Sequence, residues 1–230
     1  MGSILIVARN SLALTKLAVK SALAQDVPCD VLVIDNDSAD GTSYWLRTKP
    51  LAYIAYHPQK SLSACWNAGI KAFWSVGASE VLVINNDVEI APNTYRILSA
   101  GEGFTTGVGV SDREQFKPVP GILLGTSRPH PDFSCFMIRK EVTDKVGWFD
   151  ESYYPAYCED SDYHVRMHKA GIEAVCVDLP FYHYAAGTLK NANPAEASAI
   201  KHGADANRER FRKQYGCLPG SDAYNKLFEE

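Results

Sequence analysis

The chain has 230 residues, of which 46% are hydrophobic and 22% charged, and its formal net charge is −4. This length allows one large domain or two small ones, with a hydrophobic core that needs no disulfide or metal to hold it together. A net charge of −4 excludes a broadly basic surface that would bind nucleic acid or an anionic membrane. Such a partner would therefore require a local basic patch.

Six cysteines lie far apart in the sequence with no C-x-x-C pair among them, which argues against a zinc knuckle or a small disulfide scaffold. Scattered thiols in a chain of this size are typical of a reducing compartment, where they pack as small core residues. No apolar run approaches the roughly 18 residues of a membrane span. Residues 1–8 read as a strand rather than a signal peptide. We therefore expect a cytoplasmic protein without a transmembrane segment.

The first 90 residues alternate between short apolar runs and helical patterns. Strands are expected at 3–8, 31–34, 51–57 and 81–84. Helices are expected at 11–25, where Ser11 is the cap, at 42–48 after an Asp40 and Gly41 turn, and at 62–76. Strands separated by helices of this length predict βαβ units and a mostly parallel sheet, which binds ligands just beyond the carboxyl ends of its strands.

The second half of the chain has a different pattern. Shorter strands are expected at 107–111, 121–127, 132–140 and 172–178, and Pro180 follows the last of them. Helices are expected at 159–171, with an acidic first turn and a glycine stop, and at 194–216, which Gly203 could interrupt. We expect a single domain over 1–230. Residues 1–90 and 91–190 form its two functional halves, and 191–230 form a C-terminal helical extension.

Polar residues follow three of the expected strands. Asn85, Asn86 and Asp87 come directly after the apolar run 81–84, where buried amides and a carboxylate are costly unless something satisfies them. Arg9 follows the first strand, and Asp35 and Asn36 follow the second. Because the carboxyl ends of parallel strands meet at one edge of a sheet, these residues predict one crevice. The alternative is that residues 85–87 only cap the next turn.

Four segments resemble, in order and spacing, the signatures of glycosyltransferase family 2. They are VIDNDSADGT at 33–42, VLVINNDVEI at 81–90, VGWFDESYYPAYCEDSDYHVRMHKAG at 146–171 and HYAAGT at 183–188. The resemblance is nearest to the rhamnosyltransferase-like and galactofuranosyltransferase-like branches. It implies a GT-A fold, which is α/β with a Rossmann-like, mostly parallel sheet, helices on both faces and a smaller acceptor-side half. It also implies a nucleotide-sugar donor, a divalent metal and inversion at the anomeric carbon.

The resemblance assigns a divalent metal, Mn²⁺ or Mg²⁺, to Asp87 and His183. Such a metal neutralises the charge that develops on the departing diphosphate in sugar transfer. Asp87 matches the last Asp of the family's D-x-D motif, with Asn85 in the place of the first, and Mn²⁺ accepts imidazole beside carboxylate oxygen. From the residues alone, a single histidine between aromatic residues is more often a histidine satisfied in the core or at the surface than a metal ligand.

The resemblance also assigns the nucleotide-sugar side of the site, with UDP-, dTDP- or GDP-sugars as the expected donors. The residues concerned are Arg9, Asp35, Asn36, Asn67, Asn85 and Asn86. Asp35 and Asn36 match positions that face the base and ribose, and Asn86 could hydrogen-bond the ribose or a phosphate. The structural alternatives are that Asp35 caps its loop and that Arg9 and Asn67 only support the fold.

Glu159 and Asp160 are the expected catalytic carboxylates. Asp160 matches the general base of the family's E-D motif, which would accept the proton of the acceptor hydroxyl, and Glu159 has a supporting role. Two carboxylates that open a helix could otherwise simply complement its macrodipole. Trp148, Asp150 and Tyr154 lie in a segment that resembles the acceptor side of the family.

The expected acceptor is a glycan or a lipid-linked glycan, ahead of a protein or a modified DNA base. The basic residues of the last helix could contact an anionic acceptor or a membrane surface peripherally, or form a solvated face; they are Arg208, Arg210, Arg212 and Lys213. His164 and His168 have a metal-binding spacing but no H-E-x-x-H carboxylate, so we expect them to face solvent.

Two rival functions remain open at the level of sequence. A sugar nucleotidyltransferase should carry a Gly-rich, basic loop after the first strand, where this chain has ARNSLAL. A non-catalytic nucleotide-sugar or carbohydrate-binding protein would not need Asp160. Release of nucleoside diphosphate from a nucleotide sugar would separate the enzyme from the binding protein.

Overall fold

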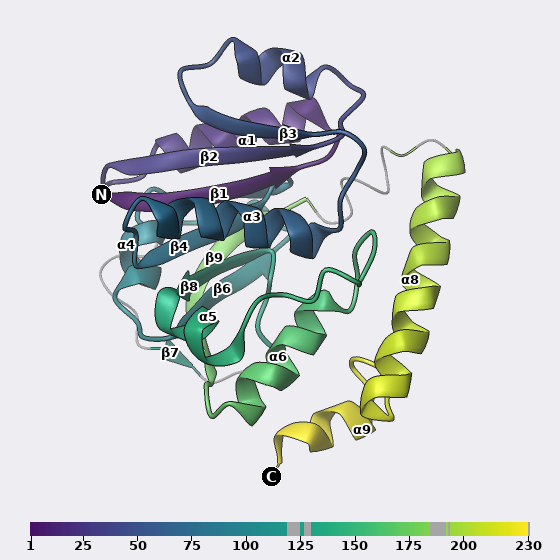
Figure 1. The fold of residues 1–230 in the computed structure, drawn as a ribbon. Coiled ribbons are helices and arrows are strands. Elements are labelled where there is room, and N and C mark those ends of the chain that lie inside the picture. Colours follow the sequence, from purple (N-terminus) through teal and green to yellow (C-terminus); the bar gives the residue numbers. More distant parts are fainter. Residues whose placement is uncertain (119–124, 127–129, 185–191, 193, 230) are drawn as a thin grey trace.

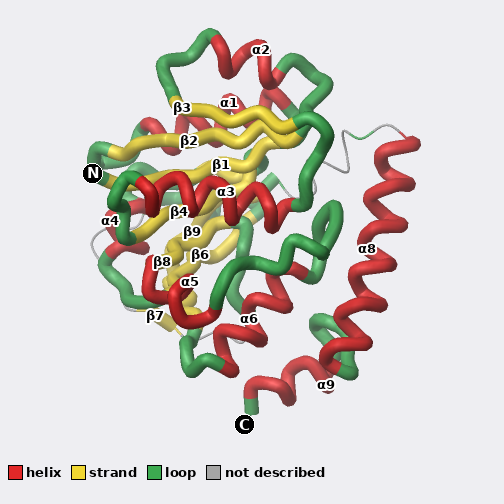
Figure 2. Tube along the Cα trace, in the orientation of Figure 1, coloured by secondary structure: helices red, strands yellow, loops and turns green. Residues whose placement is uncertain are grey.

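The computed structural model describes residues 1–118, 125–126, 130–184, 192 and 194–229. Over this range the chain forms a twisted sheet with helices on both faces (Figures 1 and 2). The strand order is β3-β2-β1-β4-β8-β6-β9-β5, with β7 paired to β9, so one sheet takes strands from both halves of the chain. The predicted α/β class is confirmed.

The first four strands of this order run parallel. They are β3 (Ala52–Tyr56), β2 (Cys29–Asn36), β1 (Gly2–Ala8) and β4 (Glu80–Asn85). The helices that connect them are α1 (Leu12–Leu23), α2 (Thr42–Arg47) and α3 (Leu62–Ser75). Every strand and helix predicted for residues 1–90 is therefore present, with ends that differ by at most two residues.

Strand β1 is buried along its whole length. Its side chains alternate between the two faces, so that Ile4 and Ile6 pack in the cluster that contains α1 and Leu5 in the cluster that contains α3. Full burial of each such side chain contributes about 1.5–3 kcal/mol. Gly69 lets α3 approach closely, because a Cβ there would lie 2.3 Å from Leu5 Cδ1. Packing on both faces holds the carboxyl end of β1 in place.

The remaining strands mix their directions. β8 (Cys135–Arg139) is antiparallel to β4 and to β6 (Phe104–Val110), while β6 runs parallel to β9 (Ala174–His183). The short strands β5 (Val88–Glu89) and β7 (Gly125–Thr126) are antiparallel to β9. The strands are thus parallel, as expected, in the first four positions of the sheet and in the β6–β9 pair, and the other pairs are antiparallel.

The strand predicted at 172–178 is longer than expected, because β9 continues through Pro180 to His183. Pro180 lies opposite Val108, directly after a register shift in β6, where a missing N–H interrupts no regular ladder. The strand predicted at 107–111 begins earlier, at Phe104, and the one predicted at 132–140 is shorter. Of the strand predicted at 121–127, residues 121–124 and 127 lie outside the described residues.

Both helices predicted for the second half are present as α6 (Glu159–Lys169) and α8 (Pro194–Tyr215). Helix α8 continues through Gly203 without interruption. Among the described residues, the sequence pattern missed the helices α4 (Thr94–Ser99), α5 (Lys140–Val146) and α9 (Asp222–Asn225), the 3₁₀ helix η1 (Lys226–Phe228) and the short strand β5.

The cap of α1 differs from the prediction. Ser11 occupies the cap position with φ 58°, and its side chain makes no capping hydrogen bond. The backbone N–H of Leu12 instead donates to Asp40 Oδ2 at 2.6 Å, from the turn before α2. A carboxylate at this place also complements the positive end of the helix macrodipole.

None of the six cysteines forms a disulfide, and five of them are buried, as expected for core thiols. Across the helices that the structure describes, none is long and apolar enough to cross a membrane.

Helix α8 and the segment after it pack against α6 through a third hydrophobic cluster, which includes Val165, Phe211 and Tyr224 (Figure 1). This packing buries His164, which has 8% of its surface exposed. Its ring stacks on Phe228 at a centroid distance of 4.2 Å, and Nδ1 lies 3.3 Å from Tyr224 Oη. The prediction that His164 faces solvent was wrong, because the C-terminal segment covers this face of α6.

Burial, together with the neighbouring His130 and His168, lowers the pKa of His164 from 6.5 to about 4. Its contribution to stability is therefore complete above the unfolded-state pKa and is lost as the pH falls from 6.5 toward 4. We expect the wild type to lose more free energy of unfolding between about pH 7 and about pH 4.5 than His164→Phe does, by about 2–3 kcal/mol.

Urea unfolding at both pH values measures this difference, with His168→Phe as the matched control on the same helix. Equal losses of stability in the wild type and in His164→Phe would contradict the burial of a neutral imidazole.

Candidate functional site

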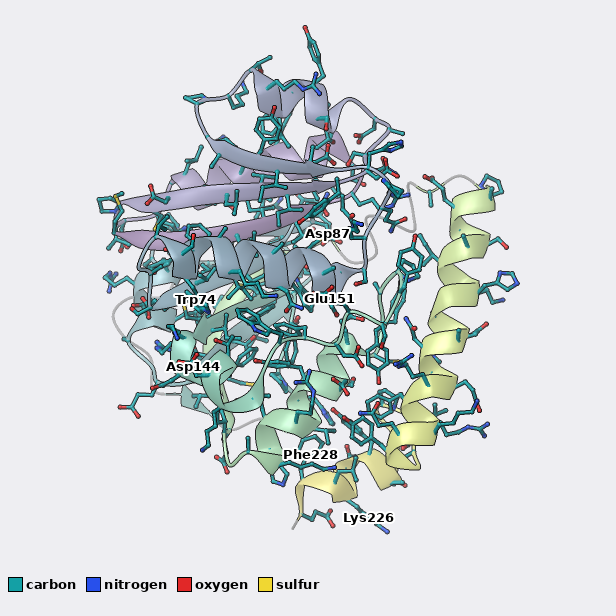
Figure 3. All side chains as sticks on the ribbon, in the orientation of Figure 1. Trp74, Asp87, Asp144, Glu151, Lys226 and Phe228 are labelled. Carbon is teal, nitrogen blue, oxygen red and sulfur yellow. The ribbon has the colours of Figure 1, made fainter. Side chains whose placement is uncertain are left out.

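A cavity of about 760 Å³ lies at the carboxyl ends of β1, β2 and β4. Eight of the residues predicted for the site line it: Arg9, Asn36, Asn85, Asn86, Asp87, Glu159, Asp160 and His183. They come from both halves of the sheet and from the first turn of α6. Asp87 is labelled in Figure 3, near the strand ends that face α8.

Asp87 and His183 are neighbours because β5 pairs with β9. Val88 lies opposite His183 in this antiparallel pair, and the N–H of Tyr184 donates to the carbonyl of Asp87 at 2.9 Å. The ladder thereby places His183 Nε2 3.4 Å from Asp87 Oδ1. The Asp87 side chain is 10% exposed and that of His183 is 26% exposed, so the carboxylate is the less hydrated member of the pair.

Two opposing effects act on the pKa of His183. Burial alone would lower it, but the hydrogen bond and negative charge of Asp87, together with the charge of Asp132, outweigh burial and raise the pKa above its ordinary value. The negative charge of Asp87 therefore favours the protonated form of the imidazole. A metal bound at this position would displace that proton.

The geometry of this pair fits two adjacent ligands of one octahedral metal. Ligands about 2.1 Å from such a metal and at right angles lie about 3.0 Å apart, close to the 3.4 Å between Nε2 and Oδ1. No group of three or more His, Cys, Asp or Glu within the described residues could hold a metal ion. The protein would thus supply two ligands and leave the other positions to phosphate oxygens and water, which is the usual arrangement for Mg²⁺-type sites.

Glu159 and Asp160 lie on another part of the cavity wall. Glu159 is 4% exposed, and its Oε2 has no hydrogen-bond partner among the residues that the structure describes. Burial, and then repulsion from Asp160, raise the pKa of Glu159 well above its ordinary value. Burial also raises the pKa of Asp160, although hydrogen bonds from Ser161, the shorter at 2.6 Å, oppose this. Both carboxyl groups are therefore stronger proton acceptors than ordinary surface carboxylates.

Three of the polar residues at the strand ends hold the loops around the cavity. Arg9 donates from Nη1 to the carbonyls of Asn36 and Asp37, both at 2.9 Å. The Asn36 amide pairs with the backbone N–H and C=O of Lys60, at 2.8 and 2.9 Å. Asn86 Nδ2 donates to the Asn10 carbonyl and to Thr15 Oγ1, each at 3.0 Å. These contacts fix the shape of the cavity edge.

The structure does not place Asp35 or Asn67 on the wall of the cavity. Asp35 is 1% exposed and accepts hydrogen bonds from the N–H of Ser38 and the hydroxyl of Ser43. Asn67 is bonded to both backbone groups of Phe149. These contacts match the structural alternatives for the two residues.

The predicted acceptor-side residues also lie outside the lining of the cavity. Trp148 covers the ammonium of Lys71, 4.5 Å from the ring centroid, and Asp150 accepts hydrogen bonds from Ser152. Tyr154 is 50% exposed. The residues directly after it, Pro155 to Ser161, do line the cavity.

Several lining residues had no signal in the sequence. They are Trp66, Asp132 and Tyr157, together with Leu218 and Pro219 from the segment after α8. Arg208 from α8, one of the basic residues considered as a contact for an anionic acceptor, also lines the cavity. Asp132 acts on the site electrostatically, because its charge adds a small upward contribution to the pKa of both His183 and Asp160. Its only local sign is its place between Pro131 and the apolar run of β8.

No family model matches the sequence, and no curated protein matches it. Solved glycosyltransferase structures do match. The mannosyltransferase PcManGT from Pyrobaculum calidifontis, in complex with GDP-Man and Mn²⁺, has a TM-score of 0.66 and 15% identity over 99% of this chain and 67% of that one.

Two further similar structures are S. aureus TarS 1-349 in complex with UDP-GlcNAc, and GalNAc-T7 with UDP, GalNAc and Mn²⁺. The first has a TM-score of 0.60 and 15% identity over 99% of this chain and 78% of that one. The second has a TM-score of 0.59 and 13% identity over 80% of this chain and 43% of that one. At such identities the similarity establishes the fold, which is the GT-A-like α/β fold of these glycosyltransferases.

If His183 binds metal beside Asp87, His183→Ala should weaken the binding of Mn²⁺ by about tenfold or more, because it removes one of two protein ligands. Free Mn²⁺ can be counted by electron paramagnetic resonance during a titration at about pH 7.5, and thermal melting of the metal-free protein should change little.

His168→Ala is the matched control and should bind Mn²⁺ like the wild type. A His183→Ala variant that melts at a much lower temperature but keeps its Mn²⁺ affinity would show that His183 is a packing residue.

Proposed function

We propose that the chain is a glycosyltransferase that moves a sugar from a nucleoside-diphosphate sugar to the hydroxyl of an acceptor, with inversion at the anomeric carbon. One observation carries the proposal: a single cavity contains both the Asp87–His183 pair and the Glu159–Asp160 pair. The cavity has a volume of about 760 Å³, which is in the range of pockets that bind small molecules such as a nucleotide sugar. The similarity of the fold to solved glycosyltransferases also supports the proposal.

The two pairs suit the two requirements of sugar transfer. The Asp87–His183 pair would hold Mn²⁺ or Mg²⁺, and the metal, when bound, would neutralise charge on the diphosphate. Asp160 would accept the proton of the acceptor hydroxyl. A base is most effective when its pKa lies near the working pH, and burial moves that of Asp160 upward. Attack from the face opposite the leaving nucleotide gives inversion.

The proposed substrate classes rest on the similar structures and on the sequence resemblance. GDP-, UDP- and dTDP-sugars are the proposed donors, and the similar structures contain GDP-Man, UDP-GlcNAc and UDP. Four segments that resemble glycosyltransferase family 2, with its rhamnosyltransferase-like and galactofuranosyltransferase-like branches, favour a glycan or lipid-linked glycan as the acceptor.

A sugar nucleotidyltransferase is less compatible with the first βα turn. In such enzymes a triphosphate binds the N–H groups at the start of the helix. Here Asp40 Oδ2 accepts the N–H of Leu12 at 2.6 Å, so a carboxylate already occupies the amino end of α1. A second negative group at this place would be repelled.

Asp160→Asn should lose about 10²- to 10⁴-fold in the rate of sugar transfer, the usual range for a general base, because Asn keeps the size of the side chain but cannot accept the proton. Binding of the donor with metal should change little. Rates can be measured by release of nucleoside diphosphate once a screen of glycan acceptors has given a substrate.

Asp144→Asn is the matched control, since Asp144 lies outside the cavity lining and its exposed carboxylate pairs with Lys140 on the same helix. Near wild-type transfer by Asp160→Asn, or a product that retains the donor's anomeric configuration, would rule out this mechanism. A wild type that binds nucleotide sugar but neither transfers nor hydrolyses it would favour the binding-protein alternative.

A further inference from the structure

Helix α8 is mostly polar and exposed, and its buried residues are Ala204, Asn207 and Phe211. Their spacing places them on one face of the helix. Asn207 is the unexpected member of the set, because a polar amide with 4% exposure must find hydrogen-bond partners inside the protein. Its partners belong to the loop that leads to the proposed catalytic carboxylates.

Asn207 Nδ2 donates to two carbonyls of this loop, that of Tyr154 at 3.2 Å and that of Ala156 at 2.8 Å. The carbonyl between them, on Pro155, accepts the N–H of Leu62 at 2.9 Å, from the first turn of α3. Three consecutive carbonyls are therefore held from two sides, by the body of the sheet domain through α3 and by the C-terminal helix through Asn207.

Gly203 allows this contact to be close. A Cβ at this position would lie 2.3 Å from Pro155 Cδ and 3.0 Å from the Tyr154 carbonyl oxygen. Helix α8 thus meets the loop at two positions one turn apart, first by backbone against Pro155 and then by the amide of Asn207. The same glycine that could have interrupted the helix instead lets it pack against the loop.

The residues after the held carbonyls adopt a costly conformation. Tyr157 and Cys158 both have positive φ, 80° and 73°, and the next residues are Glu159 and Asp160. A left-handed conformation is unfavourable for a residue other than glycine and persists only where the surroundings impose it. The direction in which α6 begins, and with it the position of Asp160, therefore depends on how firmly 154–156 are held.

The C-terminal end of α8 is hydrogen-bonded to α6, the helix that begins with Glu159. Asp162, 1% exposed and in the first turn of α6, accepts hydrogen bonds from Tyr215 Oη at 2.7 Å and Gln214 Nε2 at 3.2 Å. Arg166 Nε donates to its other oxygen at 2.8 Å. Helix α8 is thus attached both before and after the Glu159–Asp160 pair, and the pair lies between the two attachments.

We propose that Asn207 is a positioning residue, which holds the segment 154–158 in the conformation that places Asp160 on the cavity wall. The C-terminal helix is on this account part of the active site, although Asn207 itself does not line the cavity. The consequence for catalysis rests on the function proposed above. The structural part, that Asn207 restrains this loop, does not depend on it.

Asn207→Asp tests the proposal with an isosteric change, which removes the two N–H donors and leaves the packing volume unchanged. We expect amide hydrogen exchange across residues 157–162 to become at least about tenfold faster, because the loop loses its restraint. We also expect kcat to fall by about 10²-fold, the effect of a displacement of about 1 Å at a catalytic group, with the KM for the donor within about twofold of the wild type.

Gly203→Ala is a second variant that acts on the same loop without removing a hydrogen bond, and it should produce the same two effects. Glu209→Ala, on the same helix with its carboxylate paired to Arg212 and Lys213, is the control and should change neither. Unchanged exchange across 157–162 in Asn207→Asp would overturn the proposal. So would a variant whose kcat falls only in step with the folded fraction.

The two proposals can fail separately. If the wild type transfers no sugar from any donor, the proposed function fails, and the exchange measurement still decides whether Asn207 restrains the loop. If the wild type is active and Asn207→Asp exchanges faster without a loss of kcat, the loop is restrained but Asp160 does not need that restraint, which contradicts the positioning role.

Discussion

The antiparallel pairing of β5 with β9 is the interaction on which the candidate site depends. β5 has only two residues, yet its register with β9 brings Asp87 and His183 together across nearly a hundred residues of sequence. Asp87 directly precedes β5 and His183 ends β9, so the pairing of Val88 with His183 brings the two side chains within 3.4 Å of each other. The proposed metal pair is therefore a product of strand register.

This constraint explains why the site needs both halves of the chain. The parallel strands β1, β2 and β4 bring the first polar residues to one edge, as expected for an open α/β sheet. The second half adds His183 at the end of β9 and Asp160 at the start of α6, and the C-terminal helix holds the loop before Asp160. The cavity lies where these three contributions meet.

The sequence was most informative where the signal is local. Periodic apolar runs predicted all the strands and helices of residues 1–90 except the short β5, and strand ends predicted Arg9 and residues 85–87 at the cavity. Helix α5 was missed because it begins at Lys140 directly after β8, so no turn residues separate the two patterns. The assignment of His183 came from a resemblance to a family, since a single histidine in an aromatic strand carries no pattern of its own.

Other contacts could not be predicted because they depend on how separate segments pack. Asp35 is hydrogen-bonded to Ser38 in its own loop and Asn67 to Phe149, contacts that the sequence pattern does not reveal. His164 is buried by a segment about 60 residues later in the chain, and Asn207 bonds to a loop about 50 residues earlier. Such contacts follow from tertiary packing, which no window of the sequence contains.

The most direct measurement is titration calorimetry of the wild type and Asp87→Ala with GDP, UDP and dTDP, each with Mn²⁺ and with excess chelator. We expect at least one nucleotide to bind the wild type with Mn²⁺, and its affinity to fall at least about tenfold with chelator or in Asp87→Ala, because the phosphates lose their counter-charge. Equal affinity for that nucleotide in the presence and absence of metal would contradict the assignment of Asp87 and, with it, the proposed site.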